Sequence, residues 1–298
     1  KERNIINELD KNILKNIISD LYYPNSPYDF TVISSNILGE IYEVFISETL
    51  IVKNNEVILQ PKKENLNRAI VTTPYDVVKF MVSKSLENFT DKKSPDEIKN
   101  LRIADIACGS GIFLTEVLDY LINYCQDWYE RNKKYDHLEE TYTNTYKLTY
   151  KEKKEILTSC LYGVDIDYQA VEVAKFSLLL KVLENETEET VTNEKPVLPS
   201  LDNNIINGNS LIDLEMLKDA TTDELISINP FSFNNINGGN KFDLIIGNPP
   251  YVKTEDMIKL QNKKEVQAYK SEYYVAYKQF DKYFLFIQRA IDLVKDSG

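Results

Sequence analysis

A short apolar run that leads into two consecutive prolines constrains this chain more than any other stretch. Residues 242–247 are mostly apolar and are bounded by glycine and proline, which indicates a buried strand. The tetrapeptide Asn248-Pro249-Pro250-Tyr251 follows at its carboxyl end, where open α/β sheets place their ligand sites. Prolines lack N–H groups and fix φ, so the carbonyl oxygens of Asn248 and Pro249 stay available as acceptors. Acceptors beside the Tyr251 ring suit a planar group that donates N–H bonds, such as an amide or an exocyclic amine.

A glycine turn between a predicted strand and a predicted helix marks a second site. Residues 101–106 are expected to form a buried strand and residues 112–121 the core face of a helix, with Cys108-Gly109-Ser110-Gly111 between them. Glycines at this spacing let backbone N–H groups approach a ligand, and Asp105 at the strand end favours a cationic or zwitterionic ligand over a pyrophosphate. The third glycine of the dinucleotide fingerprint is absent. Such a turn alone is equally consistent with a plain strand–helix connection.

Two further predicted strands end in polar residues. Residues 161–165 form one, and Asp165 at its tip stands where α/β sheets hold ribose hydroxyls. Residues 205–211 form the other and present Asn209, whose amide can hydrogen-bond the edge of a heterocycle. The carboxylate, the glycine turn and the proline motif therefore all fall at the carboxyl ends of strands, which favours a shared ligand site.

The remaining segments are expected to support this site. Residues 1–70 indicate a mainly helical region with a candidate hairpin at residues 50–59, and residues 284–294 a helix with one apolar stripe. Residues 123–158 have the composition of a polar insertion, and residues 184–200 that of a mobile loop. Thr72 or Thr73 is expected to cap a helix that starts at Pro74. The free N–H groups and the hydroxyl at the start of this helix can bind a carboxylate, but an ordinary capped helix is the simpler interpretation.

Composition limits the chemistry. The three cysteines lack C-x-x-C spacing, so we expect no metal site and reduced thiols in a cytoplasmic protein. His137, the single histidine, lies in a polar stretch, so histidine acid–base catalysis is not expected. The run Glu152-Lys153-Lys154 is interpreted as a solvated face rather than as part of a nuclease. No apolar run approaches the ~18 residues of a membrane span.

The charge balance bears on nucleic-acid binding. The chain of 298 residues carries 35 basic and 47 acidic residues, a net charge of −12, whereas proteins that neutralise many phosphates usually have a basic face. Either nucleic acid is not the partner, or the basic part lies outside this chain. Beyond residue 251 lysines alternate with tyrosines, which suits either a nucleic-acid backbone with stacking bases or helices that bury their tyrosines.

Taken together, these segments resemble the amino-methylating DNA methyltransferases of the γ order, in particular those of single-chain type IIG restriction-modification enzymes. The resemblance covers residues 38–298 and depends on a combination of motifs: Thr73-Pro74, the run from Asp105 to Phe113, the strand end from Val164 to Asp167, Gly208-Asn209-Ser210-Leu211, and Asn248-Pro249-Pro250-Tyr251. It implies an α/β fold, a Rossmann-like sheet that binds S-adenosylmethionine (AdoMet). Residues 1–70 would be a helical region and residues 71–298 a catalytic domain truncated at its carboxyl end, before the fifth strand.

The resemblance also implies the residues of the site. The catalytic residues would be Asn248, Pro249, Pro250 and Tyr251, and the cofactor-binding residues Thr73, Asp105, Ala107, Cys108, Gly109, Gly111, Asp165, Ile166 and Asn209. The family more often has aspartate where Asn209 stands, so we expect weaker or altered cofactor binding. Double-stranded DNA with a flipped adenine would be the partner of the intact enzyme, whose target-recognition region is missing here.

Two other functions fit parts of the same pattern. The Asn-Pro-Pro-Tyr motif also serves enzymes that methylate the N5 amide of glutamine in protein. A module that binds AdoMet without catalysis, as the sensor of a nuclease complex, is the second alternative. The amino-terminal helices with Thr73-Pro74 and the insertion favour the DNA enzyme over the glutamine enzyme, and the intact motif residues argue against the sensor.

Overall fold

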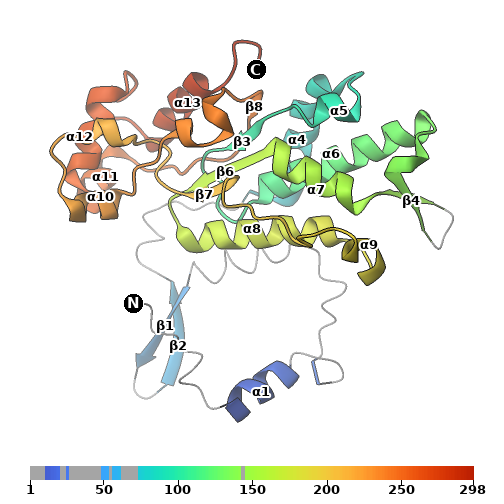
Figure 1. Ribbon diagram of the computed structural model, residues 1–298. Coiled ribbons are helices and arrows are strands. Elements are labelled where there is room, and N and C mark those ends of the chain that lie inside the picture. The colour runs from blue at the N-terminus through green and yellow to red at the C-terminus, as the bar shows by residue number, and fades with distance from the viewer. Residues whose placement is uncertain (1–10, 21–24, 27–47, 54–55, 62–72, 142–144) are drawn as a thin grey trace.

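Helices cover both faces of a four-stranded parallel sheet (Figure 1). The computed structural model describes residues 11–20, 25–26, 48–53, 56–61, 73–141 and 145–298. The strands are β1 (Glu48–Lys53), β2 (Glu56–Pro61), β3 (Ile103–Asp105), β4 (Leu138–Glu140), β5 (Tyr146–Leu148), β6 (Leu161–Asp165), β7 (Ile205–Asn207) and β8 (Leu244–Ile245). The helices are α1 (Lys11–Asp20), α4 (Tyr75–Thr90), α5 (Pro95–Ile98), α6 (Ile112–Arg131), α7 (Tyr150–Cys160), α8 (Tyr168–Leu183), α9 (Glu188–Thr192), α10 (Thr222–Ile228), α11 (Thr254–Leu260), α12 (Lys263–Glu272) and α13 (Lys282–Leu293).

The order of the strands fixes where a ligand can bind. The sheet runs β7-β6-β3-β8, and all three pairings are parallel. From β3 the chain proceeds outward to β6 and β7, then returns to the opposite side of β3 with β8. The strand order therefore reverses beside β3, and open α/β sheets bind ligands in the crevice at such a switch point. The predicted α/β fold class is confirmed.

Two apolar cores lie on opposite faces of this sheet because successive strand residues point to opposite sides. Ile103 and Leu161 belong to the core under α4, α6, α7 and α8, whereas their neighbours Ala104 and Tyr162 belong to the core beside α10 to α13. The strands therefore consist of nearly continuous apolar residues rather than alternating ones, as expected for a parallel sheet that is covered on both faces.

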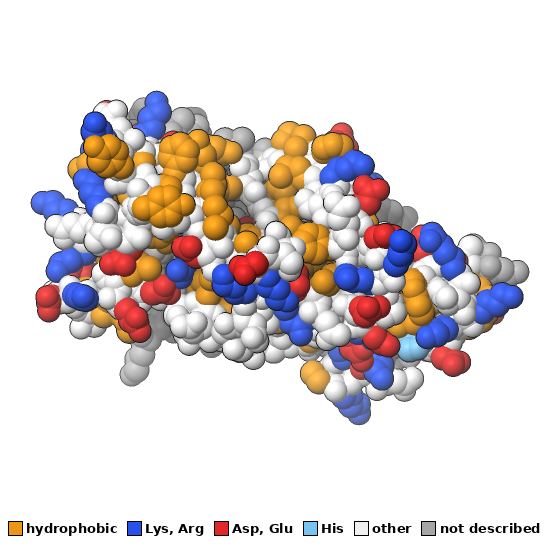
Figure 2. Space-filling model, turned by 90° about the horizontal axis from the view of Figure 1, so that it is seen from above, with side chains coloured by type: hydrophobic (Ala, Val, Ile, Leu, Met, Phe, Trp, Pro, Cys, Tyr) orange, Lys and Arg blue, Asp and Glu red, His pale blue; other side chains and the backbone are white. Residues whose placement is uncertain are grey.

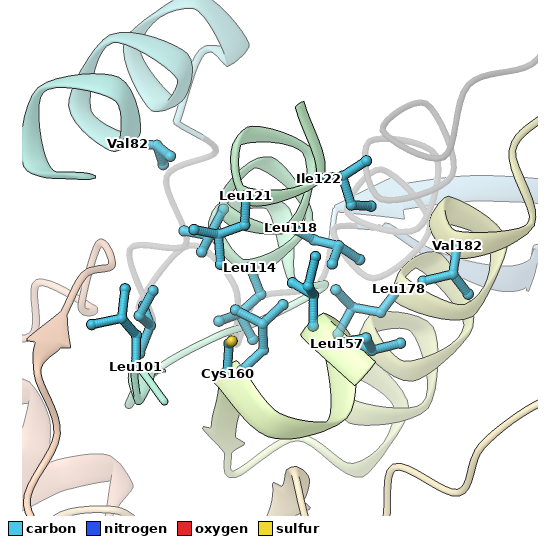
Figure 3. Packing of buried hydrophobic residues seen from close by; sticks show 14 of the residues in the cluster. Val82, Leu101, Leu114, Leu118, Leu121, Ile122, Leu157, Cys160, Leu178 and Val182 are labelled. Atoms are coloured by element: carbon cyan, nitrogen blue, oxygen red, sulfur yellow. The ribbon is translucent and has the colours of Figure 1, made fainter. Parts of the chain in front are cut away.

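The larger core is centred on α6. Figure 3 shows Leu118 of this helix pointing toward Leu157 of α7 and Leu178 of α8. All three side chains are fully buried, and burying a leucine stabilises the fold by about 1.5–3 kcal/mol. This packing fixes α6 and α8 against the sheet, so the turns that precede these helices are held at its edge.

The starts of helices α6 and α8, both next to the sheet, are each fixed by one residue. The side chain of Asp167 caps α8 by accepting the backbone N–H groups of Gln169 and Ala170. Gly111 precedes α6 with φ +85°, and a Cβ built on it would lie 2.9 Å from Cβ of Ala174 in α8. Glycine is needed there for its backbone conformation and for the close approach of the two helices. The predicted unit of strand, glycine turn and helix around residues 101–121 is confirmed.

The expected polar insertion is more ordered than its composition indicated. Helix α6 continues to Arg131, and a β4–β5 hairpin and α7 follow. Glu152 is buried, pairs with Lys99 at 2.8 Å and accepts from Nδ1 of His137 at 2.9 Å, while Tyr129 stacks on the imidazole. The interpretation of residues 152–154 as a solvated face is wrong for Glu152, because partners from other segments compensate its burial.

The segment expected to be a mobile loop, residues 184–200, is tied to α7. It contains the short helix α9, and its Glu186 is paired with Lys153 at 2.5 Å and with Lys147 at 2.7 Å. A further ion pair joins Lys154 to Glu194 at 3.2 Å. The acidic residues that suggested a loop therefore anchor it to lysines of β5 and α7.

Helix α13 forms as predicted, and apolar residues outside its predicted stripe are the ones that it buries. The expected apolar stripe is exposed, with Phe284 at 40%, Ile287 at 48% and Ile291 at 58%, whereas Leu285 and Phe286 pack into the smaller core. Figure 2 shows apolar side chains gathered on this upper side of the molecule, above α12 and α13. Periodicity predicts the helix and its stripe, but it does not say which of two apolar faces meets the sheet.

Near the amino terminus the predicted hairpin is confirmed. Strands β1 and β2 pair antiparallel with Leu50 opposite Leu59. Helix α1 lies in the region expected to be mainly helical, and a second helical pattern in that region, near residues 35–45, lies outside the described residues. In the described part of the chain, no helix is both long and apolar enough to cross a membrane.

Candidate functional site

The proline motif lies directly after β8, at the switch point of the sheet. Asn248 donates from Nδ2 to Oγ1 of Thr73 at 3.0 Å, which joins two residues 175 positions apart in the sequence. Thr73 was expected to cap the following helix, but Pro74 occupies the capping position of α4 without a side-chain hydrogen bond. The hydroxyl therefore contacts the amide of the motif instead of the helix end.

Helix α4 is held in place by α6, and this positions Thr73. The hydroxyl of Tyr75, in the first turn of α4, donates to Glu116 of α6 at 2.8 Å, and Val78 and Val82 are buried in the larger core. Burial raises the pKa of Glu116, while the hydrogen bond from Tyr75 opposes the rise. The contact between the threonine and the amide of the motif thus depends on helix packing well outside the site.

Asp165 at the end of β6 supports the glycine turn after β3. Its Oδ2 accepts the N–H of Gly109 at 2.8 Å, and its Oδ1 accepts the N–H of Asp167 at 2.9 Å. Gly109 has φ +51°, and a Cβ built on it would have nothing within 4 Å. A carboxylate has about four acceptor sites, so this acid can hold the turn and still accept a hydroxyl donor from a ligand in the open space.

Asp105 is the buried acid of the site. Its side chain is 2% exposed, and Oδ1 accepts the N–H of Ala107 at 3.0 Å. Burial raises the pKa of Asp105 to about 7; the hydrogen bond from Ala107 opposes this rise and the nearby Asp165 adds to it. Burial also raises the pKa of Asp165, and hydrogen bonds from the backbone N–H groups of Asp167 and Gly109 oppose this rise. A positive charge placed beside these acids would oppose both shifts by favouring the ionised carboxylates.

Asn209 lies beyond β7, under the same edge of the sheet. It is 4% exposed, and its Oδ1 accepts the N–H of Leu211 at 3.2 Å. The next residue, Ser210, donates to the carbonyl of Ile106 at 2.5 Å and accepts from Nε of Arg289 at its own carbonyl. The loop after β7 is thereby fixed to the loop after β3.

The structure brings the predicted residues to one edge of the sheet from four strand ends and from the start of α4. Cys108 and Gly111 are buried in the turn, Ile166 is 50% exposed at the tip of β6, and Pro249 and Pro250 are partly buried. The ring of Tyr251 is 46% exposed, with its centroid 5.4 Å from that of Tyr283. Burial raises the pKa of the Cys108 thiol, so this cysteine stays a packing residue.

Sequence reasoning missed two residues of this region. Gly247 lies against the carboxylate of Asp105, since a Cβ built on it would be 2.4 Å from Oδ1. Glu265 of α12 is buried and accepts from Nδ2 of Asn209 at 3.2 Å. The position of Gly247 between the strand and the proline motif was a sequence signal for a close contact. Glu265 stands among lysines, and nothing in its surrounding sequence indicated a contact with the site.

Alanine substitutions at two of these glycines should separate packing from ligand binding. Gly247→Ala should lower the unfolding free energy by about 1–3 kcal/mol, because the new methyl group overlaps the Asp105 carboxylate. Gly109→Ala should cost only about 1 kcal/mol for its positive φ, but its methyl group enters the open space of the turn and should block ligand binding. Chemical denaturation and calorimetric titration with S-adenosylhomocysteine measure the two effects. Equal stability losses would contradict this assignment.

The strand order, the glycine turn and the proline motif at the switch point define a Rossmann-like methyltransferase fold. Residues 159–298 match the model of a protein family described as Eco57I restriction-modification methylase. The resemblance to the methyltransferase modules of restriction-modification enzymes is therefore confirmed.

Individual relatives agree with this class. The chain is 46% identical to the type II restriction enzyme and methyltransferase RM.Eco57I of Escherichia coli, over 95% of this chain and 28% of that protein. It is 24% identical to the type II methyltransferase M.BstVI of Geobacillus stearothermophilus, over 71% of this chain and 29% of that protein. The chain thus spans less than a third of either relative.

A solved structure shares the fold. The type IIL restriction-modification enzyme MmeI, solved in complex with DNA, matches with a TM-score of 0.50 and 14% identity. The match covers 96% of this chain and 34% of MmeI. At this identity the likeness concerns the fold alone.

Proposed function

We propose that this chain is the catalytic module of a DNA adenine-N6 methyltransferase that uses AdoMet and belongs to a restriction-modification enzyme acting in the cytoplasm. The observation that carries the proposal is the proline motif at the switch point, with the amide of Asn248 hydrogen-bonded to Thr73 beside the glycine turn. The similarity to restriction-modification methyltransferases supports the reaction class.

The residues present fit AdoMet. Gly109 leaves open space at a turn whose backbone conformation suits glycine, and Asp165 holds that turn while keeping acceptor capacity for ribose hydroxyls. The buried carboxylate of Asp105 suits a ligand that carries positive charge. When bound, AdoMet would supply a methyl group made electrophilic by a sulfonium sulfur. In this proposal the side chain of Ile166, exposed at the tip of β6, contacts the adenosine.

Asn248 and Pro249 would act on the amine of the target. Because Nδ2 of Asn248 faces Thr73, its Oδ1 is the amide atom that accepts a hydrogen from the amine. The carbonyl of Pro249 accepts the second hydrogen. These two bonds aim the nitrogen lone pair at the methyl donor and stabilise the positive charge that develops during transfer. No titratable base is required.

The target base would stack on the aromatic side of the site. An adenine inside a duplex cannot reach these acceptors, so the base must be flipped out of the helix. Tyr251 presents an exposed ring directly after the acceptors, and Tyr283 lies beside it. The 298-residue chain has a net charge of −12, which argues against a large surface for phosphate contacts. We therefore place the recognition of DNA sequence elsewhere in the restriction-modification enzyme.

Transfer of tritium from labelled AdoMet tests the acceptor class. The full-length protein is incubated with genomic DNA from cells that lack adenine methylation, with total RNA, and with a protein extract. We expect label in DNA alone. Label in the protein extract would favour the glutamine-N5 reaction, in which an amide nitrogen takes the place of the adenine amine, and binding of AdoMet with no label in any acceptor would favour the sensor.

A further inference from the structure

A buried hydrogen-bond network lies behind Asn209. Nδ2 of Asn209 donates to Oε1 of Glu265 at 3.2 Å, and Oδ1 of the same amide accepts the N–H of Leu211 at 3.2 Å. Asn209 is 4% and Glu265 is 6% exposed, although they come from the end of β7 and from α12. The contact joins the site to a helix that follows the proline motif in the sequence.

The two partners determine the orientation of the amide without ambiguity. A carboxylate accepts hydrogen bonds and does not donate them, so Glu265 requires the NH₂ side of Asn209. A backbone N–H donates only, so Leu211 requires the oxygen side. A flipped amide would set oxygen against carboxylate and NH₂ against N–H, which costs both buried bonds. Oδ1 therefore stays directed away from α12.

Glu265 is itself held from two sides. The hydroxyl of Tyr269 donates to Oε1, and the ammonium group of Lys282 lies 3.8 Å from the same oxygen. Burial and the adjacent carboxylate raise the pKa of Tyr269, so its hydroxyl keeps the proton that it donates. The carboxylate is compensated and fixed, and it can orient a neighbouring amide.

We propose that Glu265 is a positioning residue for cofactor recognition: through Asn209 it directs an acceptor oxygen at the exocyclic amine of the adenine ring of AdoMet. This inference rests on the proposed function. It also accounts for an amide at position 209. An aspartate there would place a second carboxylate 3.2 Å from Glu265, where like charges repel in a buried site. Asparagine is thus matched to Glu265.

Exchange of the pair tests the proposal. Calorimetry measures the affinity of wild type, Asn209→Asp, Glu265→Gln and the double variant for S-adenosylhomocysteine and for S-inosylhomocysteine, which has an oxygen in place of the amine. We expect Asn209→Asp to lose about tenfold or more in affinity for the adenosine ligand at about pH 8. The double variant should recover most of this loss, because the introduced glutamine can donate to the introduced aspartate. Glu265→Gln alone should lose less, since glutamine keeps an oxygen acceptor.

The preference for the adenosine ligand over the inosine ligand is the readout that a purely structural role would not change. Wild type should prefer the adenosine ligand by about tenfold. Glu265→Gln should reduce this preference, because the NH₂ of glutamine can pair with the oxygen of a flipped Asn209 amide. Glu272→Gln, an exposed position on the same helix, is the matched control and should behave as wild type. Thermal denaturation of every variant verifies folding, and a lower Tm for Asn209→Asp that returns in the double variant supports the pairing independently.

The outcomes separate the two claims. If wild type binds neither ligand, the proposed function fails and the adenine contact fails with it. If wild type binds the adenosine ligand but all variants keep its affinity and preference, the proposed function stands and the role of Glu265 is overturned. A double variant no better than Asn209→Asp also overturns the pairing.

Discussion

Replacing Asn248 with alanine should lower methyl transfer to DNA by about 10³-fold and leave the affinity for S-adenosylhomocysteine within about twofold of wild type. The substitution removes Oδ1, one of the two proposed acceptors for the amine of the target. It also leaves Thr73 without the amide that donates to its hydroxyl at 3.0 Å. Because Asn248 lies at the end of β8 and not in the glycine turn, cofactor contacts should persist. Initial rates of tritium transfer and calorimetric titration measure the two quantities.

Asn248→Asp provides a matched control. Aspartate keeps an oxygen acceptor of the same length, and the Thr73 hydroxyl can donate to it, so we expect a smaller loss, of about 10- to 100-fold. If Asn248→Ala turns over as fast as wild type, the amide does not orient the acceptor. Equal losses of turnover and ligand affinity would instead place this residue in cofactor binding.

The second large effect concerns Asp105, where Asp105→Asn should stabilise the free protein and weaken ligand binding. Burial raises the pKa of this carboxyl from 3.8 to about 7. Above about pH 7 the native state must hold a buried charge that the unfolded state exposes to water, which costs up to about 4 kcal/mol. Asparagine can still accept the N–H of Ala107 and carries no charge. It cannot compensate a cationic ligand group, so affinity for S-adenosylhomocysteine should fall roughly 10- to 100-fold.

The pH dependence has a definite sign. Between the unfolded pKa of 3.8 and the native value of about 7, the native state of wild type binds more protons at Asp105 than the unfolded state does. The contribution of Asp105 to the unfolding free energy therefore falls as pH rises through this window, and Asp105→Asn abolishes that contribution. Ligand affinity should change in the opposite direction and increase as the carboxyl ionises around pH 7.

Denaturant titrations and calorimetry from about pH 5 to pH 9 measure both dependences in wild type and Asp105→Asn. Asp167→Asn is a suitable control, because asparagine also caps helices well. Identical pH profiles for wild type and Asp105→Asn would show that this carboxyl ionises normally. A stabilised variant with full ligand affinity would remove Asp105 from the site.

Local sequence was sufficient for the parts of the fold that obey local rules. The strands ending at Asp105 and Asp165 are short apolar runs that precede a turn and an amphipathic helix, and each forms as predicted. The glycines after β3 were predictable because a turn with positive φ favours glycine. The convergence of the site residues follows from the rule that parallel strands share their carboxyl edge.

The features that escaped prediction depend on partners distant in the sequence. Lys153 and Glu186 looked solvated until the fold placed them 2.5 Å apart. The buried face of α13 depends on which apolar side meets the sheet, and periodicity alone does not decide this. Glu265 contacts Asn209 only because α12 packs behind it, which nothing within α12 itself indicates. Thr73 contacts Asn248 rather than its own helix for the same reason.

The identity of the methylated atom tests the central claim most directly. DNA is incubated with the full-length protein and AdoMet that carries a deuterated methyl group, digested to nucleosides, and analysed by mass spectrometry. Labelled N6-methyl-2′-deoxyadenosine is the predicted product, and it should be absent with Asn248→Ala. Label on cytosine, or label found in protein and not in DNA, would contradict the assignment of this site to adenine.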